Sequence, residues 1–453
     1  MLSDTKTRST STQQKLVKAP FLYHQLKLSQ QPAQFFDDLA NNFGDFVQYR
    51  GIFSFYFINH PDLVKQVLKG TNSLFDKNTV LYDRFRNVFG NGLVTAEGDL
   101  WKKQRQLIQP IFSPSAVKMF FDVMLASANK MADRWQEHAE QQTTFNVADE
   151  MNQLTLEIAG RTLFHDGFND VSDKIGSWTH TINHYSAQPP LPIVSQLWFP
   201  SPTNLKLNKV MREFHQFLSK MINKRKNHDG PADLLTILLN AKNESGEPMS
   251  EFQLMKEVLG MIVGGHETSS CALTWIWYQL CKNPDIEAKL HEELQEVLEG
   301  RLPTLQDIPK LKYTRMIVDE ATRLHPPFWF ENRNTKEDIE MWGHTIPKGS
   351  TIAFSRYSLH RHPDFWETPE RFDPERFDSS KEKNKRPFYA HVPFGGGPRV
   401  CIGINFAIME LVVILATLAQ RHRLNLDSSD KHVMQAQLTM EPKHGVSVKA
   451  TSR

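Results

Sequence analysis

The sequence is poor in cysteine, carries almost no net charge and lacks an apolar leader. Its 453 residues include three cysteines, Cys271, Cys281 and Cys401, which excludes a disulfide-stapled secreted scaffold and suits a reducing compartment. Lys and Arg number 53 against 51 Asp and Glu, for a formal net charge of +2, which is too balanced for a protein that coats nucleic acid. Residues 1–18 contain no apolar core of a signal peptide.

Long hydrophobic runs are also scarce. The segment 402–419 approaches the roughly 20 residues that a membrane span needs, but it includes Gly403 and Glu410, so we predict a helix buried by protein on every face. Neither an internal repeat nor a low-complexity linker divides the chain. We therefore expect a cytoplasmic protein without stable membrane insertion, with a polar tail over residues 1–18 and a single domain over residues 19–453.

The secondary-structure signals indicate a mainly α fold with a smaller β-rich lobe. Two short aromatic runs, Phe46–Tyr49 and Phe53–Ile58, predict a hairpin, whereas residues from about 100 to 325 show helical periodicity. A proline cluster between residues 189 and 202 predicts an irregular loop. The β-rich parts are expected at about residues 40–60, at 338–377 and in short strands between 422 and 450.

The longest predicted helix begins at a capping-box pattern, Ser250 with Gln253, and ends at Asn283-Pro284, about 30 residues later. Gly264 and Gly265 inside it should cost roughly 2 kcal/mol relative to alanine. Such a cost suggests either close packing of crossing helices or a site where a flat cofactor approaches the backbone.

A glycine-rich loop before the apolar segment carries the strongest chemical signal. Three glycines and a proline in Phe394-Gly-Gly-Gly-Pro-Arg-Val-Cys-Ile-Gly403 force an irregular backbone, and Cys401 follows at the start of the helix. A helix N-terminus and loop N–H groups would stabilise a thiolate there. Neither a zinc site nor a c-type heme attachment fits, because no second cysteine lies nearby. The alternative is a buried free cysteine.

This loop resembles the heme-binding loop of cytochrome P450 enzymes, F-x-x-G-x-R-x-C-x-G. All five fixed positions match, at Phe394, Gly397, Arg399, Cys401 and Gly403. The resemblance implies that the Cys401 thiolate is the axial ligand of the iron of heme b, a ligation that favours O–O cleavage. It also implies that Phe394 packs near the sulfur side of the heme and that Arg399 pairs with a propionate.

Further motifs follow in the order of the family. Glu320-Ala-Thr-Arg323 is E-x-x-R, and Pro374-Glu-Arg-Phe377 lies between it and the glycine loop. By resemblance, Glu320, Arg323 and Arg376 form a buried structural network behind the heme. Taken alone, a Glu and an Arg three residues apart on a helix are usually a surface ion pair.

Three more residues resemble family partners of the heme propionates. Trp101 and Arg105 form W-x-x-x-R on one helix face, and Arg333 lies ten residues after Arg323. The alternative for the first two is a Trp at the edge of the core beside a solvated Arg.

The middle of the long helix, Gly264-Gly265-His266-Glu267-Thr268, resembles the oxygen-activation motif of the family, [A/G]-G-x-[D/E]-T. The resemblance implies that Gly264 and Gly265 lie against the cofactor. It implies that Thr268 stabilises iron-bound dioxygen and helps to deliver protons, and that Glu267 connects this relay to solvent. His266 occupies the free position of the motif.

Aromatic and apolar residues near these motifs predict an apolar substrate, although each could equally be core packing. The candidates for the pocket wall are Phe328, Trp329, Phe330, Met261 and Val263, together with Tyr82–Phe89 and the region of Leu438–Met440.

Together the resemblance implies a single cytochrome P450-type domain with heme buried between the long central helix and the Cys-loop helix. The expected activity inserts one oxygen atom of dioxygen into a small apolar molecule, a fatty acid, terpenoid or similar lipid-like compound. The chemistry belongs to the heme, while the protein binds and orients. Electrons would come from NAD(P)H through a separate ferredoxin or flavodoxin and its reductase, docked near Lys102 and Lys103. The alternatives are a heme-thiolate peroxygenase or isomerase without a reductase, a non-catalytic heme sensor, and a helical binding protein without heme.

Overall fold

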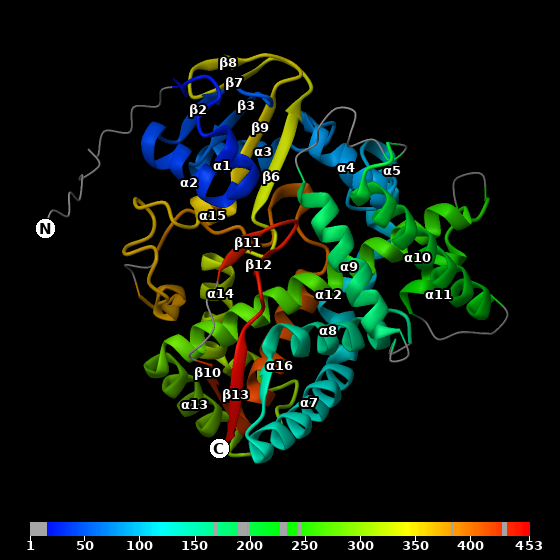
Figure 1. The fold of residues 1–453 in the computed structure, drawn as a ribbon, viewed down its shortest axis with the longest axis vertical. Helices are drawn as coiled ribbons and strands as arrows, with labels where there is room; N and C mark the ends of the chain where they lie inside the picture. The colour runs from blue at the N-terminus through cyan, green and yellow to red at the C-terminus, as the bar shows by residue number, and fades with distance from the viewer. Residues whose placement is uncertain are drawn as a thin grey trace, which may run out of the picture.

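The aromatic runs near residue 50 form the predicted antiparallel hairpin, which lies inside a six-stranded sheet. The structure is a computed structural model that describes residues 16–165, 168, 171–188, 197, 199–226, 233–242, 246–381, 385–427 and 433–453. In spatial order the strands of this sheet are β1 (Val17–Lys18), β2 (Phe46–Tyr49), β3 (Phe55–Ile58), β9 (Thr351–Ser355), β6 (Phe330–Thr335) and β4 (Phe75–Asp76). Figure 1 shows the sheet at the top of the molecule, above the helices.

Three smaller sheets are formed largely by the C-terminal strands. They are β10 (His422–Leu426) with β13 (Ser447–Ser452) and β5 (Thr144–Asn146), β11 (Met434–Ala436) with β12 (Met440–Pro442), and β7 (Ile339–Met341) with β8 (His344–Ile346). The prediction of short strands after residue 422 is therefore confirmed.

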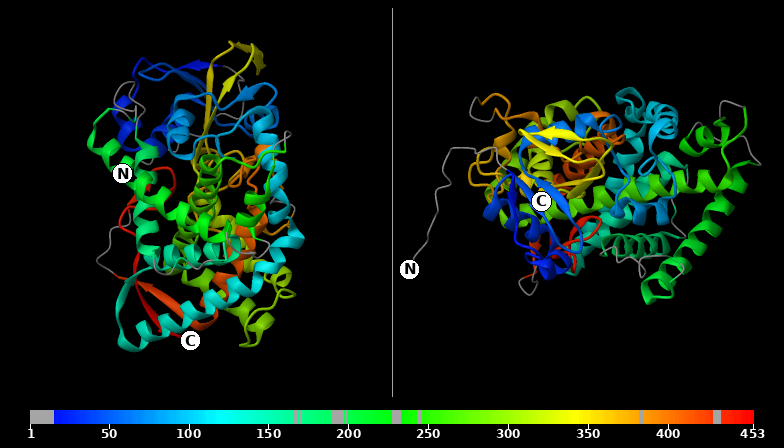
Figure 2. Two further views of the ribbon diagram at one scale, coloured as in Figure 1. Left: turned by 90° about the vertical axis from the view of Figure 1, so that its right-hand side faces the viewer. Right: turned by 90° about the horizontal axis from the view of Figure 1, so that it is seen from above.

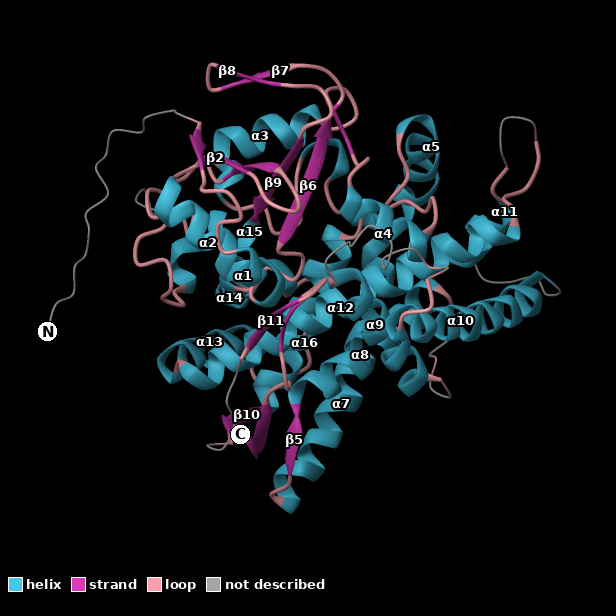
Figure 3. Cartoon of the chain, turned by 45° about the horizontal axis from the view of Figure 1, so that its top comes forward, coloured by secondary structure: helices cyan, strands magenta, loops and turns pink. Residues whose placement is uncertain are grey.

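Helices make up most of the remaining chain, which confirms the mainly α fold with a smaller β-rich lobe. Figure 3 shows the six-stranded sheet grouped with α1–α3 at one end, away from the helical bulk. The helices before the centre of the chain are α1 (Gln25–Gln30), α2 (Pro32–Phe43), α3 (Pro61–Gly70), α4 (Val80–Phe89), α5 (Gly98–Ile108), α6 (Pro114–Val117), α7 (Phe121–Gln141), α8 (Val147–Leu163), α9 (Ser172–Ala187), α10 (Pro202–Lys226) and α11 (Leu234–Asn240). Those that follow are α12 (Glu251–Lys282), α13 (Pro284–Leu298), α14 (Lys312–Leu324), α15 (Arg356–Leu359) and α16 (Ile404–Arg421).

The long helix α12 crosses the molecule, as the right-hand view of Figure 2 shows, and packs against α8, α14 and α16. Its predicted ends are confirmed. The Ser250 side chain accepts a hydrogen bond from the N–H of Gln253, and the helix closes at Asn283 before Pro284. The Gln253 side chain does not complete the capping box, because it turns instead to the Asn91 carbonyl and to Glu257.

The apolar helix α16 begins two residues after the predicted start and is buried against α7, α12, α13 and α14. By length and hydropathy alone it is the one single helix in the described ranges that could cross a membrane, with 61% of that window buried. Core helices of soluble proteins pass the same test.

Two predictions about the β-rich lobe and the tail need correction. Val17 and Lys18 are not part of a loose tail, since they pair in parallel with Val47 and Gln48. Edge pairing of this kind uses backbone hydrogen bonds and leaves no side-chain pattern in a two-residue strand. Strand β6 lies before the predicted 338–377 region, and most of the proline cluster falls outside the described residues.

Candidate active site

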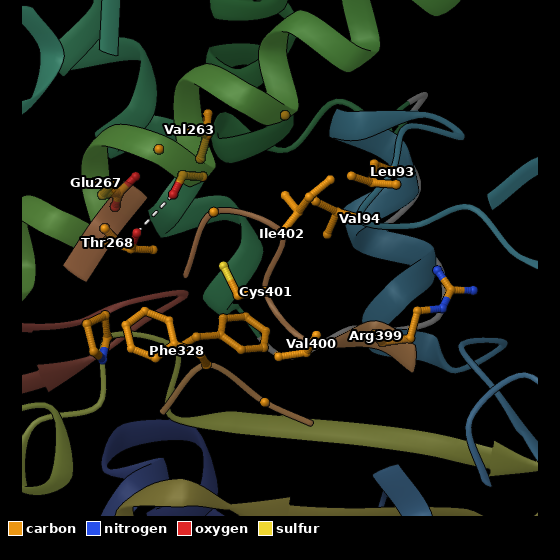
Figure 4. Close-up of a pocket in the computed structure, with 18 of the residues that line it drawn as sticks. Leu93, Val94, Val263, Glu267, Thr268, Phe328, Arg399, Val400, Cys401 and Ile402 are labelled. Atoms are coloured by element: carbon orange, nitrogen blue, oxygen red, sulfur yellow. Dashed lines mark hydrogen bonds between the residues drawn. The ribbon is translucent and has the colours of Figure 1, made fainter. Parts of the chain in front are cut away.

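A cavity of about 350 Å³ lies between α12 and the glycine loop that carries Cys401. In Figure 4 the Cys401 sulfur points into this space, with Glu267 and Thr268 on one side and Leu93 and Val94 on the other. Residues from α4, α5, α12, β6 and α15 line it together with the loops before α5 and α16. The cavity therefore brings together segments that lie more than 300 residues apart in the chain, from Lys77 to Thr439.

The glycine loop is held in a backbone shape that only glycine fits at Gly397. This residue has a φ of +64°, and a Cβ there would lie 2.1 Å from the Leu68 carbonyl oxygen of α3. The N–H of Cys401 donates to the Phe394 carbonyl at 2.9 Å, so the loop closes on itself and fixes the thiol. The local sequence thus sets the direction of the Cys401 side chain.

The Cys401 thiol is open to the cavity yet deeply enclosed by protein. Burial raises its pKa above the ordinary value, and the Gly403 N–H, Arg105 and Arg356 oppose the shift only in part. The expected thiolate-stabilising effect of the helix start is therefore smaller than the cost of desolvation. A metal cation at the sulfur would reverse the balance, because coordination deprotonates a thiol.

The two glycines of α12 differ in what they face. A Cβ at Gly264 would meet nothing within 4 Å, whereas one at Gly265 would touch Leu163 of α8, at an ordinary 3.8 Å. The crossing-helix alternative is therefore not supported at Gly264, while Gly265 faces the packed helix α8. The Thr268 hydroxyl donates to the Gly264 carbonyl at 2.9 Å, shown as the dashed line in Figure 4, and Thr268 also lines the cavity.

Glu267 is buried beside Thr268 and is held by two distant elements. Its Oε1 accepts hydrogen bonds from the Asn183 amide of α9 and, at 3.2 Å, from the Thr439 hydroxyl, while its Oε2 has no partner in the structure. Burial, with a smaller contribution from Glu441, raises the pKa of Glu267 to about 8. The carboxyl therefore carries a proton at neutral pH, and any link to solvent would run past Asn183 and Thr439.

Three of the predicted propionate partners meet at one end of the cavity. The Arg399 guanidinium lies 3.9 Å from the centre of the Trp101 ring and donates to Asn72 and to the Ala96 carbonyl. Arg105 donates to the Val400 carbonyl at 2.9 Å. All three predicted residues line the cavity, so helix α5 and the glycine loop share one polar corner.

Arg333 joins this corner from strand β6. It forms an ion pair with Glu331 and donates to the Tyr82 hydroxyl at 3.2 Å, but its buried Nε has no partner. Burial opposes ionisation of Glu331, yet Arg333 and Arg356 overcome it and lower the pKa of Glu331 to about 2. Lys77 lies close by and donates to the Val94 carbonyl at 2.6 Å.

The charge in this corner is out of balance. Arg105, Arg333, Arg356 and Arg399 line the cavity, and two carboxylates pair with them: Glu331, with Arg333 and Arg356, and Glu97, with Arg399 at 3.0 Å. Lys77 lines it too, but burial and the neighbouring arginines lower its pKa well below the ordinary value. Buried cations need anionic partners, and the free Nε of Arg333 needs an acceptor. A flat apolar group with two carboxylates and a metal, as heme has, fits the cations, the glycines of α12 and the thiol together.

The predicted structural network is present next to this site. Arg323 donates to both carboxylate oxygens of Glu320, at 2.7 and 2.8 Å, and neither side chain is exposed. Arg376 lies 3.4 Å from Glu320. Arg323 also donates to the His360 and Pro369 carbonyls at 2.8 Å each. The surface ion-pair interpretation of this motif is therefore wrong.

The predicted pocket wall is partly placed on the cavity. Met261, Val263 and Phe328 line it, but Trp329 and Phe330 do not. Trp329 lies in the core of the β-rich lobe and donates to the Gln437 carbonyl, while Phe330 begins β6 and stacks on Phe36. Neither residue therefore contributes to the predicted pocket wall, because both side chains pack with Phe36 in the core of the β-rich lobe. The Tyr82–Phe89 segment is helical, within α4, and contributes Tyr82, Phe85 and Phe89 to the lining.

Sequence reasoning missed Lys77, Glu331, Arg356 and Asn183. Lys77, Arg356 and Asn183 become part of the site through contacts between distant segments, and Glu331, although it pairs with Arg333 two residues along the strand, belongs to no spaced motif. No local signal could have identified them.

Comparison with known proteins agrees with this geometry. The family model described as cytochrome P450 matches residues 15–449. The chain is 34% identical over 416 residues to cyclooctat-9-en-7-ol 5-monooxygenase of Streptomyces melanosporofaciens, covering 89% of this chain and 88% of that one. It is 33% identical to pentalenene oxygenase of Streptomyces avermitilis, covering 90% of each. It is 28% identical to human ultra-long-chain fatty acid omega-hydroxylase, covering 86% and 78%.

Proposed function

The chain belongs to the cytochrome P450 family of monooxygenases, and we propose that it oxygenates a neutral, apolar, terpenoid-like molecule with electrons from a separate redox partner. The named monooxygenases of cyclic terpenoids among its relatives support this substrate class.

One observation carries the substrate proposal. The part of the cavity lining that comes from α4, α12 and residues 438–439 contains no cation among the described residues. Its polar side chains are Tyr82, Glu267, Thr268, Ser269 and Thr439, and the remainder is apolar. A fatty acid would require a partner for its carboxylate, since burying an unpaired charge is costly. A neutral hydrocarbon skeleton needs none.

Each of these residues would have a distinct role in holding the cofactor. Cys401 would ligate the iron, Phe394 would pack near its sulfur, and Trp101, Arg105, Arg333 and Arg399 would hold the propionates. Heme with a thiolate ligand, when bound, activates dioxygen for insertion into a C–H bond. Gly264 and Gly265 leave room for the ring, and Glu320, Arg323 and Arg376 fix the backbone behind it.

Two residues of α12 would handle protons. Glu267 holds a proton at neutral pH because its pKa is about 8, and its unpartnered Oε2 belongs to a side chain that lines the cavity. The Thr268 hydroxyl donates its one proton to the Gly264 carbonyl, which leaves its oxygen free to accept a hydrogen bond. Passing that proton to the cavity would require the hydroxyl to rotate away from the carbonyl while its oxygen accepts a replacement proton.

We place the docking site of a ferredoxin or flavodoxin, reduced by NAD(P)H through its reductase, on the face behind Cys401. A second cavity of about 550 Å³ lies there, lined by Arg105, Gln109, Pro110 and Ile404 together with Cys401. Lys102, exposed and paired with Asp99, and Lys103 precede Arg105 on α5 and are the lysines that we assign to this docking site. Charge-neutral replacement of both lysines should slow electron transfer, and an unchanged rate would remove them from the docking site.

The proposal also retains a single domain, now with Val17 and Lys18 in its sheet, and a cytoplasmic location without stable membrane insertion. The burial of α16 and the three unpaired cysteines support it.

The first test is the absorption spectrum of the purified protein, reduced and exposed to carbon monoxide. We expect the red-shifted Soret band of thiolate-ligated heme, lost in Cys401→Ser. No heme band after expression with heme supplied would refute the cofactor assignment.

The second test compares a panel of neutral cyclic terpenes with fatty acids, using spin-state shifts for binding and mass spectrometry for products. Tighter binding of fatty acids would overturn the substrate class. Turnover with hydrogen peroxide alone, and none with any ferredoxin or flavodoxin system, would favour the peroxygenase alternative.

A further inference from the structure

The loop of residues 90–97, between α4 and α5, forms one wall of the cavity. Leu93 and Val94 line the pocket from this loop, and Figure 4 shows them at the opposite side of the cavity from Glu267 and Thr268. The loop has no regular secondary structure, so its position depends on where its backbone groups find partners.

Most backbone groups of the loop bond within the loop or to the end of α4, but the Leu93 N–H and the Asn91 carbonyl find partners in the first two turns of α12. The Leu93 N–H donates to Oε2 of Glu257 at 2.9 Å, in a fully buried hydrogen bond. The Asn91 carbonyl accepts from the side-chain amides of Gln253, at 3.0 Å, and Gln104, at 2.8 Å. Gln253 also donates to Oε1 of Glu257 at 2.7 Å, so the carboxyl is held in place from the helix side.

The start of the loop is tightened by Lys256. Its ammonium donates to the Val88 carbonyl at 2.7 Å. Its side-chain stem packs closely on Gly90, where an added Cβ would lie only 2.9 Å from it. At the other end the Val94 and Ala96 carbonyls accept from Lys77 and Arg399. The loop is therefore fastened at both ends, and Glu257 supplies the fastening beside Leu93.

We propose that Glu257 is a positioning residue that sets which molecules fit the cavity. It is 1% exposed and lies outside the cavity lining, so it acts on a bound molecule only through Leu93 and Val94. This inference rests on the proposed function, because the wall it fixes matters only if the cavity holds a substrate.

The experiment uses the full-length ferric holoenzyme and three variants. Glu257→Leu removes the acceptor for the Leu93 N–H, whereas Glu257→Gln keeps an acceptor oxygen without the charge. The matched control is Thr274→Val, which deletes a buried hydrogen bond of the same helix, to the Ser270 carbonyl at 2.8 Å, far from the loop. All three should retain the carbon monoxide spectrum.

The first readout is hydrogen exchange of peptides that cover residues 90–97. Burial raises the pKa of Glu257 to about 7, so its carboxyl is only partly ionised near neutral pH, and losing the buried hydrogen bond that it accepts favours local opening by about tenfold. We expect exchange at Leu93 to rise at least about tenfold in Glu257→Leu and to stay within about threefold of wild type in Glu257→Gln and Thr274→Val. This measurement does not depend on turnover.

The second readout is the binding of two iron-ligating probes of different size. Imidazole is too small to need the wall, whereas 4-phenylimidazole must fit against it. We expect the Kd for 4-phenylimidazole to rise about tenfold in Glu257→Leu, with the Kd for imidazole within about twofold, and recovery in Glu257→Gln.

The outcomes separate this inference from the proposed function. Absence of any imidazole shift in wild type would refute heme binding, not the role of Glu257. The inference would be overturned if Glu257→Leu showed the same hydrogen exchange and the same ratio of the two Kd values as wild type. It would also be overturned if Glu257→Gln lost affinity for 4-phenylimidazole as much as Glu257→Leu does. Should Glu257→Leu fail to fold, Gln253→Ala, at a half-buried side chain, should still raise exchange at residues 91–93, and the absence of any rise would overturn the inference.

Discussion

Replacing Arg323 should test whether the buried Glu320–Arg323 pair supports the site. Arg323 makes two hydrogen bonds to the Glu320 carboxylate and donates to the His360, Pro369 and Arg371 carbonyls, all without solvent exposure of either side chain. Arg323→Met leaves the carboxylate and three carbonyls short of donors. Breaking a buried pair from one side costs about 3–5 kcal/mol.

Some compensation remains at Glu320. The N–H of Asp373 donates to Oε1 at 2.8 Å, and Arg376 lies 3.4 Å away. We therefore expect Arg323→Met to lower the free energy of unfolding by about 4 kcal/mol at pH 7.5, a large fraction of the roughly 5–15 kcal/mol of a typical protein. The loss should be smaller at pH 6, because burial raises the pKa of Glu320 and protonation relieves the unpaired charge.

The assay is urea unfolding of the holoenzyme, followed by the heme Soret band and by tryptophan fluorescence. Arg323→Lys gives a milder, measurable variant that keeps the charge and loses the forked geometry. The control is Arg315→Ala on the same helix, where the pair with Asp319 involves an arginine that is 41% exposed and should contribute less than about 1 kcal/mol. A loss in Arg323→Met no larger than in this control would refute the reasoning.

Three further predictions address the cavity. Thr268→Ala should divert electrons into hydrogen peroxide while substrate still binds, and an unchanged ratio of product to NAD(P)H consumed would contradict the proton role. Because the pKa of Glu267 is raised from its ordinary 4.5 to about 8, folding takes up a proton between these values, so this group makes the free energy of unfolding fall as pH rises from 4.5 to 8. Glu267→Gln should remove that contribution. The free energy of unfolding of the variant minus that of wild type, measured with urea, should therefore be larger at pH 8 than at pH 5.5. The same difference at both pH values would exclude the contribution of Glu267. Gly397→Ala should abolish stable heme incorporation, because its Cβ would meet the Leu68 carbonyl at 2.1 Å, whereas Gly176→Ala, on α9 and outside the cavity lining, should leave heme content intact because nothing lies within 4 Å of a Cβ there. Equal heme content in the two variants would refute the steric argument.

The sequence predicted those structural features that are determined by residues close to one another in the chain. The glycine loop is constrained by its own residues, as Gly397 and Cys401 show, and α12 begins and ends at the caps that its sequence carries. Fixed spacing therefore located the thiol, the two glycines of α12 and the Glu320–Arg323 pair without a structure.

The parts that failed depend on partners that are distant in the chain. Lys77 and Asn183 become site residues only through Val94 and Glu267, which lie on other segments. Gln253 was assigned to a capping box because that pattern is local, but its amide serves the Asn91 carbonyl. A polar residue that hydrogen-bonds a distant backbone group cannot be recognised from the residues around it in the sequence, because the local pattern reports only on its own helix.

The same burial shapes both the chemistry and the specificity of the cavity. Its four arginines gather on the side formed by α5, β6, α15 and the glycine loop, while the α12 side is neutral only because Glu267 keeps its proton. An ionised carboxylate there would hold water at the cavity wall, and an apolar substrate would have to displace that water at a cost in free energy. The proton that Glu267 can supply is therefore also what keeps this wall compatible with an apolar substrate. A variant that lowered its pKa by exposing the side chain would weaken proton delivery and substrate binding together, which ties the hydrogen bonds from Asn183 and Thr439 to both properties.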